Sequence, residues 1–200
     1  MKLKVLSSSD CEQVRQWRNS QTEMLRTSFP LTQEQQIEFY RNIVCNRQAN
    51  ARYWGIWIEI KTRNNITAVS GECKKDCNVC DDCYYDYIPV LIGMCGLENI
   101  QWENCLAEIS LIFNPEYSMD EYGEEALMIL LHEGFMNINL KNIYAEIYEC
   151  NPYYKFWIEQ VIKHAVKLSF LPDRKYLNGK YYGSIYLNFN KECFYENIIT

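Results

Sequence analysis

The chain of 200 residues lacks the long apolar runs that membrane proteins need. A helix that spans a bilayer takes about 20 consecutive apolar residues, and no segment approaches that length. The first ten residues, Met-Lys-Leu-Lys-Val-Leu-Ser-Ser-Ser-Asp, also lack the apolar core of a secretory signal peptide. The sequence therefore predicts a soluble, cytoplasmic protein with no membrane partner.

Glycine and proline are scarce, with 8 and 5 residues, and no segment rich in Pro, Gly or Ser divides the chain. Such segments usually mark linkers between domains. Hydrophobic residues make up 48% of the chain, which is enough for one substantial core. We expect a single domain over residues 1–200.

Basic residues are outnumbered, since 20 Lys and Arg face 26 Asp and Glu, giving a net charge of -6. Nonspecific affinity for nucleic acids comes mainly from clustered Lys and Arg. The only local basic cluster is Arg174, Lys175 and Lys180, which is too small for this and is expected to be a solvated turn. No nucleic-acid partner is predicted.

Cysteine is plentiful instead, with ten residues, four of which lie close together: Cys73, Cys77, Cys80 and Cys83. Four thiolates can hold one structural zinc ion, and Cys95 or Cys105 could replace one of the four. A reduced, solvent-facing loop tip and a disulfide are the alternatives, the disulfide being disfavoured in a cytoplasmic chain. The spacing of the first three also matches the radical-SAM motif, but the chain that follows is too short for that barrel.

Periodicity and capping signals predict the order β-α-α-β-β-β-α-β-α-β-β. Capping boxes at Asp10 with Gln13 and at Thr32 with Gln35 indicate two helix starts. The expected strands cover residues 2–6, 53–60, 89–97, 106–113, 142–149, 166–171 and 181–189, and the expected helices cover 10–19, 32–45, 121–137 and a segment from Pro152. The cysteine cluster then falls in a hairpin insertion at about 62–87.

Five segments, in this order and spacing, resemble the GNAT acyltransferase superfamily, especially the branch that acylates protein N-termini, amino sugars and small amines. They are Val14-Arg-Gln-Trp-Arg-Asn19, Phe29-Pro-Leu-Thr-Gln-Glu-Gln-Gln-Ile-Glu-Phe-Tyr40, Ile92-Gly-Met-Cys-Gly-Leu97, Ala107-Glu-Ile-Ser-Leu-Ile112 and Arg174-Lys-Tyr-Leu-Asn-Gly-Lys-Tyr-Tyr182. The resemblance implies an α/β (α+β) fold, in which about four helices flank a mixed, mostly antiparallel sheet of about seven strands.

The resemblance also implies acetyl-CoA as co-substrate. In the family it lies in a wedge opened by a bulge in the fourth strand, here Ile109 to Asn114, and its pyrophosphate rests on backbone N–H groups entering the next helix. The family's loop pattern, Arg/Gln-x-x-Gly-x-Gly/Ala, aligns with Ser118, Glu121 and Gly123, of which only Gly123 matches. The cofactor-binding residues implied are Leu111, Ile112, Phe113, Ser118, Glu121, Tyr122, Gly123, Glu124 and Asn151.

Transfer by direct attack of an amine needs a base for the ammonium and an acid for the departing thiolate. Glu108 is the candidate base; alternatively it only forms a pair on a sheet face. The Tyr that often acts as the general acid in the family aligns with Trp157, whose indole cannot protonate sulfur. Tyr154 is the nearby substitute. Neither His132 nor His164 is expected to act as a catalyst.

The predicted function is thus an acyl-CoA-dependent N-acyltransferase, which moves an acetyl group to a primary amine of a small molecule or a protein. The alternative is a catalytically degenerate member that acts as a binding or regulatory module, because Ser118, Glu121 and Trp157 depart from the family pattern together. The oligomeric state is not predicted.

Overall fold

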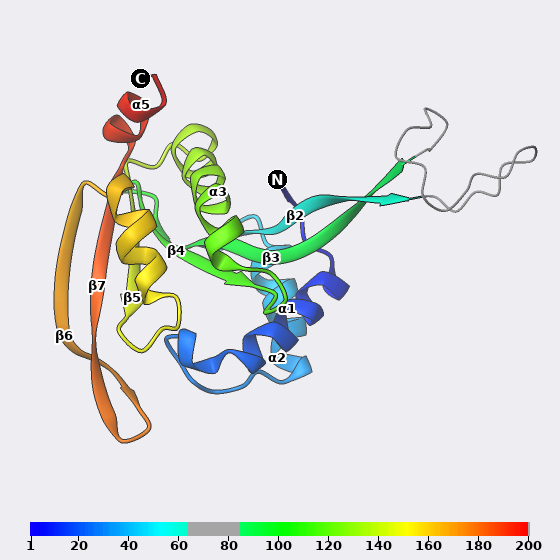
Figure 1. Ribbon diagram of the computed structural model, residues 1–200, viewed down its shortest axis with the longest axis horizontal. Coiled ribbons are helices and arrows are strands. Elements are labelled where there is room, and N and C mark those ends of the chain that lie inside the picture. The colour runs from blue at the N-terminus through cyan, green and yellow to red at the C-terminus, as the bar shows by residue number, and fades with distance from the viewer. Residues whose placement is uncertain (64–84, 200) are drawn as a thin grey trace, which may run out of the picture.

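The computed structural model describes residues 1–63 and 85–199 (Figure 1). Its strands are β1 (Lys2–Lys4), β2 (Arg52–Arg63), β3 (Tyr85–Gln101), β4 (Leu106–Phe113), β5 (Asn142–Tyr148), β6 (Lys167–Leu177) and β7 (Lys180–Asn190). Its helices are α1 (Ser8–Ser20), η1 (Thr22–Met24), α2 (Gln33–Phe39), η2 (Tyr40–Val44), α3 (Met119–His132), η3 (Glu133–Asn137), α4 (Tyr154–Phe156), η4 (Trp157–Val161), η5 (Ile162–His164) and α5 (Lys191–Ile199).

The seven described strands form one sheet in the order β1-β2-β3-β4-β5-β7-β6. All neighbouring strands are antiparallel except β4 and β5, which are parallel. This confirms the predicted mixed, mostly antiparallel sheet. The helix α5 was not predicted. Asn190 lies just before it, and its side-chain oxygen accepts a hydrogen bond from the N–H of Glu192. An Asn at such a position is a sequence signal for the start of a helix.

Two apolar clusters pack on the two faces of the sheet. Figure 1 shows α3 on one side of β3 and β4, and α1 with α2 on the other. The larger cluster, which includes Leu127, Leu130 and Phe135, packs between the sheet and α3. The smaller cluster, which includes Val14 and Ile112, packs under α1. The strand β4 contributes to both clusters, because its alternate side chains point to opposite faces.

Local capping signals place the first two helices. Thr32 and Gln35 form the expected capping box at the start of α2. The predicted box at Asp10 and Gln13 is wrong, because Ser7 is the N-cap and Asp10 is its partner three residues on. The Ser7 hydroxyl accepts from the N–H of Asp10 at 3.2 Å, while Asp10 Oδ2 accepts from the N–H of Ser7 at 2.7 Å. The helix α1 therefore begins at Ser8, two residues earlier than the expected start at residue 10.

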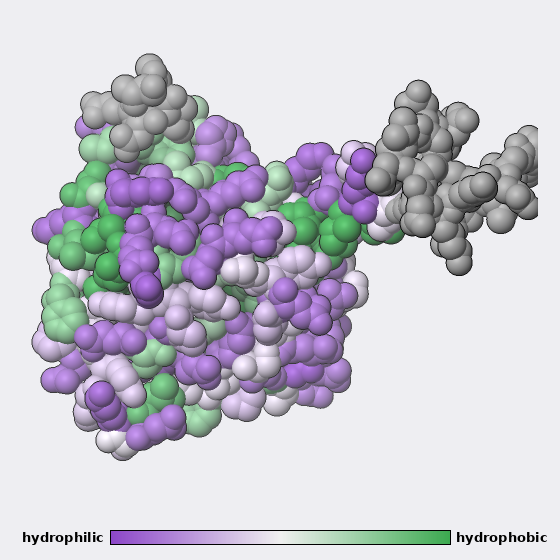
Figure 2. Space-filling view, in the orientation of Figure 1, coloured by the Kyte–Doolittle hydropathy of each residue, from purple (hydrophilic) through white to green (hydrophobic). Residues whose placement is uncertain are grey.

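The strands β2 and β3 pair as far as Arg63 and Tyr85 and form an arm (Figure 1). Figure 2 shows hydrophobic surface along this arm, where Ile60 and Ile88 are exposed. The cluster Cys73, Cys77, Cys80 and Cys83 lies outside the described residues.

The six cysteines within the described residues are free, namely Cys11, Cys45, Cys95, Cys105, Cys150 and Cys193. Cys95 pairs with Trp54 and Leu111 in the middle of the sheet and is fully buried, and burial raises the pKa of its thiol. It is therefore unsuited to replace a zinc ligand in the hairpin. Residues 1–63 and 85–199 hold no group of three or more His, Cys, Asp or Glu side chains arranged to bind a metal. None of the helices in these ranges is both long enough and apolar enough to cross a lipid bilayer.

Candidate active site

A wedge opens in the sheet where β4 and β5 part. The two strands pair only between Leu106–Glu108 and Asn142–Tyr144. Beyond Glu108, β4 continues to pair with β3 as far as Phe113. Along 109–113 the described residues therefore place no strand beside the β5-facing edge of β4.

The bulge expected within Ile109 to Asn114 is not present. The pairing of β3 with β4 is regular from Gly93 with Phe113 to Glu98 with Glu108. The irregularity lies in β3 between Glu98 and Gln101, where Asn99 has a φ of 50°. The extra residue of β3 thus sits next to Glu108, at the apex of the wedge rather than along its open side.

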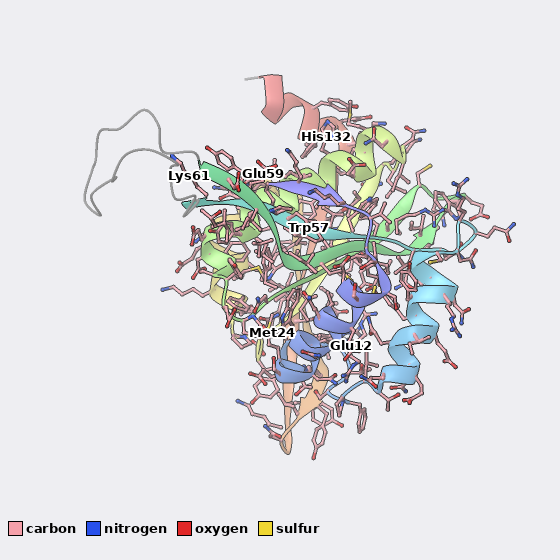
Figure 3. All side chains as sticks on the ribbon, turned by 90° about the vertical axis from the view of Figure 1, so that its right-hand side faces the viewer. Glu12, Met24, Trp57, Glu59, Lys61 and His132 are labelled. Carbon is pink, nitrogen blue, oxygen red and sulfur yellow. The ribbon has the colours of Figure 1, made fainter. Side chains whose placement is uncertain are left out.

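A cavity of about 460 Å³ occupies the wedge and the space beneath α1 and α2. This volume lies in the range of small-molecule sites, about 300–1,000 Å³. Figure 3 shows Met24, which lines the cavity, on the side of the sheet covered by α1, and His132 on the opposite side. The charged residues of the cavity wall are Arg18, Arg26, Glu98, Glu108 and Glu146.

Glu108 lies at the apex of the wedge with only 5% of its surface exposed. Its Oε1 accepts from Arg26 Nη2, and its Oε2 accepts from Asn99 Nδ2 at 2.9 Å and from the Tyr144 hydroxyl at 3.2 Å. A buried carboxylate needs such donors to keep its charge. Burial by itself would lower the pKa of Arg26, but the hydrogen bond to Tyr148 and the charge of Glu108 raise it. The result is a charged pair in the wedge.

Two hydroxyls of β5 reach the same region, and both follow from the alternation of that strand. Tyr144, Glu146 and Tyr148 share one face of β5. Burial, and next the charge of Glu108, raise the pKa of Tyr144. Tyr148 is buried, lines the cavity, and accepts a hydrogen bond from Arg26 Nε at 3.4 Å. The sequence interpretation used only the apolar face of this strand and so missed Tyr148.

A family model described as the acetyltransferase (GNAT) domain matches residues 1–153. The chain belongs to this GNAT acetyltransferase family. Membership confirms the prediction of an acetyl-CoA-dependent N-acetyltransferase.

Solved structures share the fold of this acetyltransferase. The spermidine N-acetyltransferase from Vibrio cholerae, in complex with CoA and spermine, has a TM-score of 0.71 and 16% identity, with 97% of each chain covered. A point mutant of that enzyme also has a TM-score of 0.71 and 16% identity, with 99% of each chain covered. Further mutant forms have a TM-score of 0.70 and 17% identity, over 98% of this chain and 97% of theirs. No curated protein sequence matches the chain significantly.

The cofactor-binding residues expected of the acetyltransferase fall into two groups. Leu111, Ile112 and Asn151 line the cavity together with Glu108. Phe113 does not, because its side chain is buried in the core, while its carbonyl oxygen accepts from Gln21 Nε2 at 2.9 Å. Ser118, Glu121, Tyr122, Gly123 and Glu124 lie at or in the start of α3 and are not part of the cavity wall.

The start of α3 is stabilised by an N-cap residue from its own chain segment. Ser118 is the N-cap, and its hydroxyl accepts from the N–H of Asp120 at 3.2 Å. Its carbonyl oxygen accepts from the N–H groups of Glu121 and Tyr122, at 3.3 and 3.1 Å. Met119, the first residue of α3, lines the cavity, so the N-terminus of this helix, which is the positive end of its dipole, lies beside the wedge.

Gly123 has a packing role one turn further on. A Cβ at this position would lie 2.8 Å from the Met119 sulfur and 2.8 Å from Phe156 Cζ. The glycine thus permits α3 to pack closely against α4. Glu124 accepts from His164 Nε2 at 2.6 Å and pairs with Lys163 at 2.8 Å.

The two aromatic residues considered for the acid are placed differently. Trp157 is buried and lines the cavity, as its alignment with the family's Tyr implies. Tyr154 begins α4 and is not part of the cavity wall; burial, and next Glu149, raise its pKa.

Lys175 corrects another expectation, because it is not part of a solvated turn. It is only 4% exposed, and its Nζ donates to the carbonyl oxygens of Glu23 and Leu25 at 2.5 and 2.6 Å. Lys175 thereby fixes the segment that carries Arg26 over the cavity. Its neighbour Arg174 donates to Glu146 Oε1 at 3.2 Å.

Proposed function

We propose that the protein acetylates a primary amine of a small molecule by direct attack of the amine on acetyl-CoA, with Glu108 as the base. The observation that carries this proposal is the position of Glu108, a buried carboxylate where β4 and β5 part and where the cavity opens. A base must lie within hydrogen-bond reach of the proton that it takes, and this is the wedge in which the family binds its thioester.

Acetyl-CoA would enter along the unpaired edge of β4. An extended chain with amide groups can add to an exposed strand edge through main-chain hydrogen bonds. Leu111 and Ile112 supply apolar walls, and Asn151 lies beside them on the cavity. The pyrophosphate would rest at the N-terminus of α3, near Ser118 through Glu124, where the helix dipole favours an anion.

In the reaction the amine nitrogen forms a bond to the acetyl carbon, and the carbon–sulfur bond breaks. The ammonium first gives a proton to Glu108. After the attack the nitrogen still carries a surplus proton, and this proton passes to the oxygen of the hydroxyl that protonates the departing thiolate. We assign that role to Tyr154, as the sequence predicts, or to Tyr148, which lies on the cavity wall. A phenol is a suitable donor because thiolate is a base of comparable strength.

Three donors already surround the carboxylate of Glu108, and an ammonium gains room beside it when one of them leaves. Arg26 is the donor that can leave, because 52% of its side chain is exposed and Glu146 Oε2 lies 4.0 Å from its Nη2. An incoming ammonium takes the place of the guanidinium. The enclosed volume supports a small acceptor in preference to a protein chain. The structural neighbour that is titled a spermidine N-acetyltransferase makes polyamines one class to include in a screen.

The test is a calorimetric titration of acetyl-CoA into the reduced protein, followed by mass spectrometry of a panel of amines. Micromolar binding together with acetylation of a small amine supports the proposal. Binding without any acetylation, or no binding at all, would favour the non-catalytic module suggested by Ser118, Glu121 and Trp157.

A further inference from the structure

The three carboxylates of the cavity wall already have partners. Glu98 accepts from the Tyr53 hydroxyl, Glu108 has the donors described above, and Glu146 accepts from Arg174 and from the Ser184 hydroxyl at 2.8 Å. Each of these carboxylates thus has a donor, which for Glu98 is an uncharged phenol. Arg26 is likewise engaged with Glu108.

Arg18 is different. It lies in the last turn of α1, is half-buried and lines the cavity. Its guanidinium forms no hydrogen bond or ion pair with any part of the chain that the structure describes. A cation near the C-terminus of a helix gains from the helix dipole, but that gain does not require the side chain to face a cavity. Among the five charged residues of the cavity wall, Arg18 is thus the one whose charged group has no hydrogen-bond or ion-pair partner in the described chain.

The neighbourhood of Arg18 is on the α1 side of the sheet. Arg18 and Tyr53 both line the cavity. Burial, and next the charge of Glu98, raise the pKa of Tyr53, and the charge of Arg18 opposes this rise. Tyr53 belongs to β2 and bonds to Glu98 of β3. These strands lie on the other side of β4 from β5, whereas acetyl-CoA is expected between β4 and β5. Arg18 therefore faces the part of the cavity left for the acceptor.

We propose that the acceptor is a zwitterion, an amine that also carries a carboxylate, and that Arg18 binds this carboxylate while the amine meets Glu108. This inference rests on the proposed function and names its substrate class. A planar guanidinium matches a carboxylate with two parallel hydrogen bonds. A polyamine would instead bring further positive charge next to Arg18.

The experiment compares acceptors that differ only in the carboxylate. Glycine, β-alanine and longer ω-amino acids are each paired with the alkylamine of the same chain, and spermidine is added as the polyamine. Acetylated product is quantified by mass spectrometry for the full chain and for Arg18→Gln, Arg18→Lys and Arg41→Gln. Arg41 is exposed and outside the cavity wall, so its variant is the matched control for loss of one positive charge.

For the unmodified enzyme, kcat/KM should be at least about tenfold higher for the best amino acid than for its matched alkylamine. Arg18→Gln should lower kcat/KM for that amino acid by about 10- to 100-fold and should lower it much less for the alkylamine. Arg18→Lys should restore part of the preference, because it keeps the charge but not the two-point geometry. Arg41→Gln should retain the whole preference.

Two results would overturn the inference while leaving the acetyltransferase activity intact. One is a preference for alkylamines or spermidine over every amino acid. The other is an Arg18→Gln variant whose KM for acetyl-CoA rises equally with all acceptors, which would assign Arg18 to a phosphate of the co-substrate.

Failure of the proposed function has a separate signature, namely that no acceptor is acetylated and acetyl-CoA does not bind. In that case calorimetry with each ω-amino acid and its matched alkylamine still tests Arg18, because binding needs no turnover. Binding of the amino acid that is lost in Arg18→Gln supports the carboxylate site, and equal or absent binding overturns it. Circular dichroism of each variant establishes that it is folded.

Discussion

Replacing Glu108 by Gln should separate catalysis from stability. The two side chains have the same shape, so the cavity is preserved, but the amide has no negative charge and cannot take a proton from an ammonium. The donors Asn99 and Tyr144 can still bond to the amide oxygen. Arg26 loses its closest anion but keeps Glu146, whose Oε2 lies 4.0 Å away.

The expected loss of activity and the expected loss of folding stability in Glu108→Gln differ in size. A general base contributes about 10²- to 10⁴-fold to the rate, which is about 3 to 5 kcal/mol in the activation barrier. Removing one partner of a fully buried ion pair costs about 3 to 5 kcal/mol of folding stability. Here the surviving Arg26 is 52% exposed and can be solvated, so we expect about 1 kcal/mol.

The assay follows free CoA by chromatography, because exposed cysteines such as Cys45 would react with a thiol dye. Urea unfolding is measured on the same preparations. Glu159→Gln is the control, since Glu159 is exposed and, within residues 1–63 and 85–199, pairs only with exposed Lys155, at 3.7 Å. If kcat/KM of Glu108→Gln stays within about threefold of the unmodified enzyme, Glu108 is not the base. If the free energy of unfolding falls by as many kcal/mol as the activation barrier rises, the role of Glu108 is structural.

Three further variants or reagents probe other parts of the structure. Neutralising Asp120 and Glu121 together, as Asp120→Asn and Glu121→Gln, should tighten acetyl-CoA by about tenfold in calorimetry, because repulsion of the pyrophosphate falls by roughly 1.4 kcal/mol; unchanged affinity would place the pyrophosphate elsewhere. Lys175→Met should lower the free energy of unfolding by about 2 kcal/mol, since two charged hydrogen bonds are lost. Burial lowers the pKa of Lys175 below 10.5, so the unfolded chain binds more protons and stability should rise with pH just below 10.5, a rise that Lys175→Met lacks. Exposed Cys45 should react with iodoacetamide in the folded protein, whereas Cys11, whose pKa burial raises to about 12, should react only after unfolding; peptide mass spectrometry distinguishes the two.

The parts of the structure that the sequence predicts are those with a local cause. The capping box of Thr32 and Gln35 needs only residues three apart, and the strand 106–113 agrees with β4 at both ends because its pattern is set by two buried faces. The cap at Ser7 was misplaced by one turn because Asp10 can serve either as an N-cap or as its partner.

The contacts that shape the site have no such local signal. Arg26 and Glu108 are 82 positions apart, and Lys175 and Leu25 are 150 apart. A basic residue in a closing hairpin ordinarily faces solvent, and only the fold brings Lys175 to two backbone carbonyls. Alternation along β5 would have indicated Tyr148 as a cavity residue, but the parting of β4 from β5 has to be known first.

The ion pair of Arg26 and Glu108 stabilises the empty site, and its opening when the acceptor binds prepares the occupied site for reaction. Without substrate, a buried carboxylate would be costly, and the guanidinium offsets that cost. The same guanidinium occupies the carboxylate oxygen that an acceptor ammonium has to reach. An acceptor whose ammonium displaces Arg26 therefore comes within hydrogen-bond reach of Glu108 when a proton must be taken. Proton transfer is thus linked to occupancy of the acceptor site, so Arg26→Gln should bind amines more readily but should also leave Glu108 with less support in the empty enzyme.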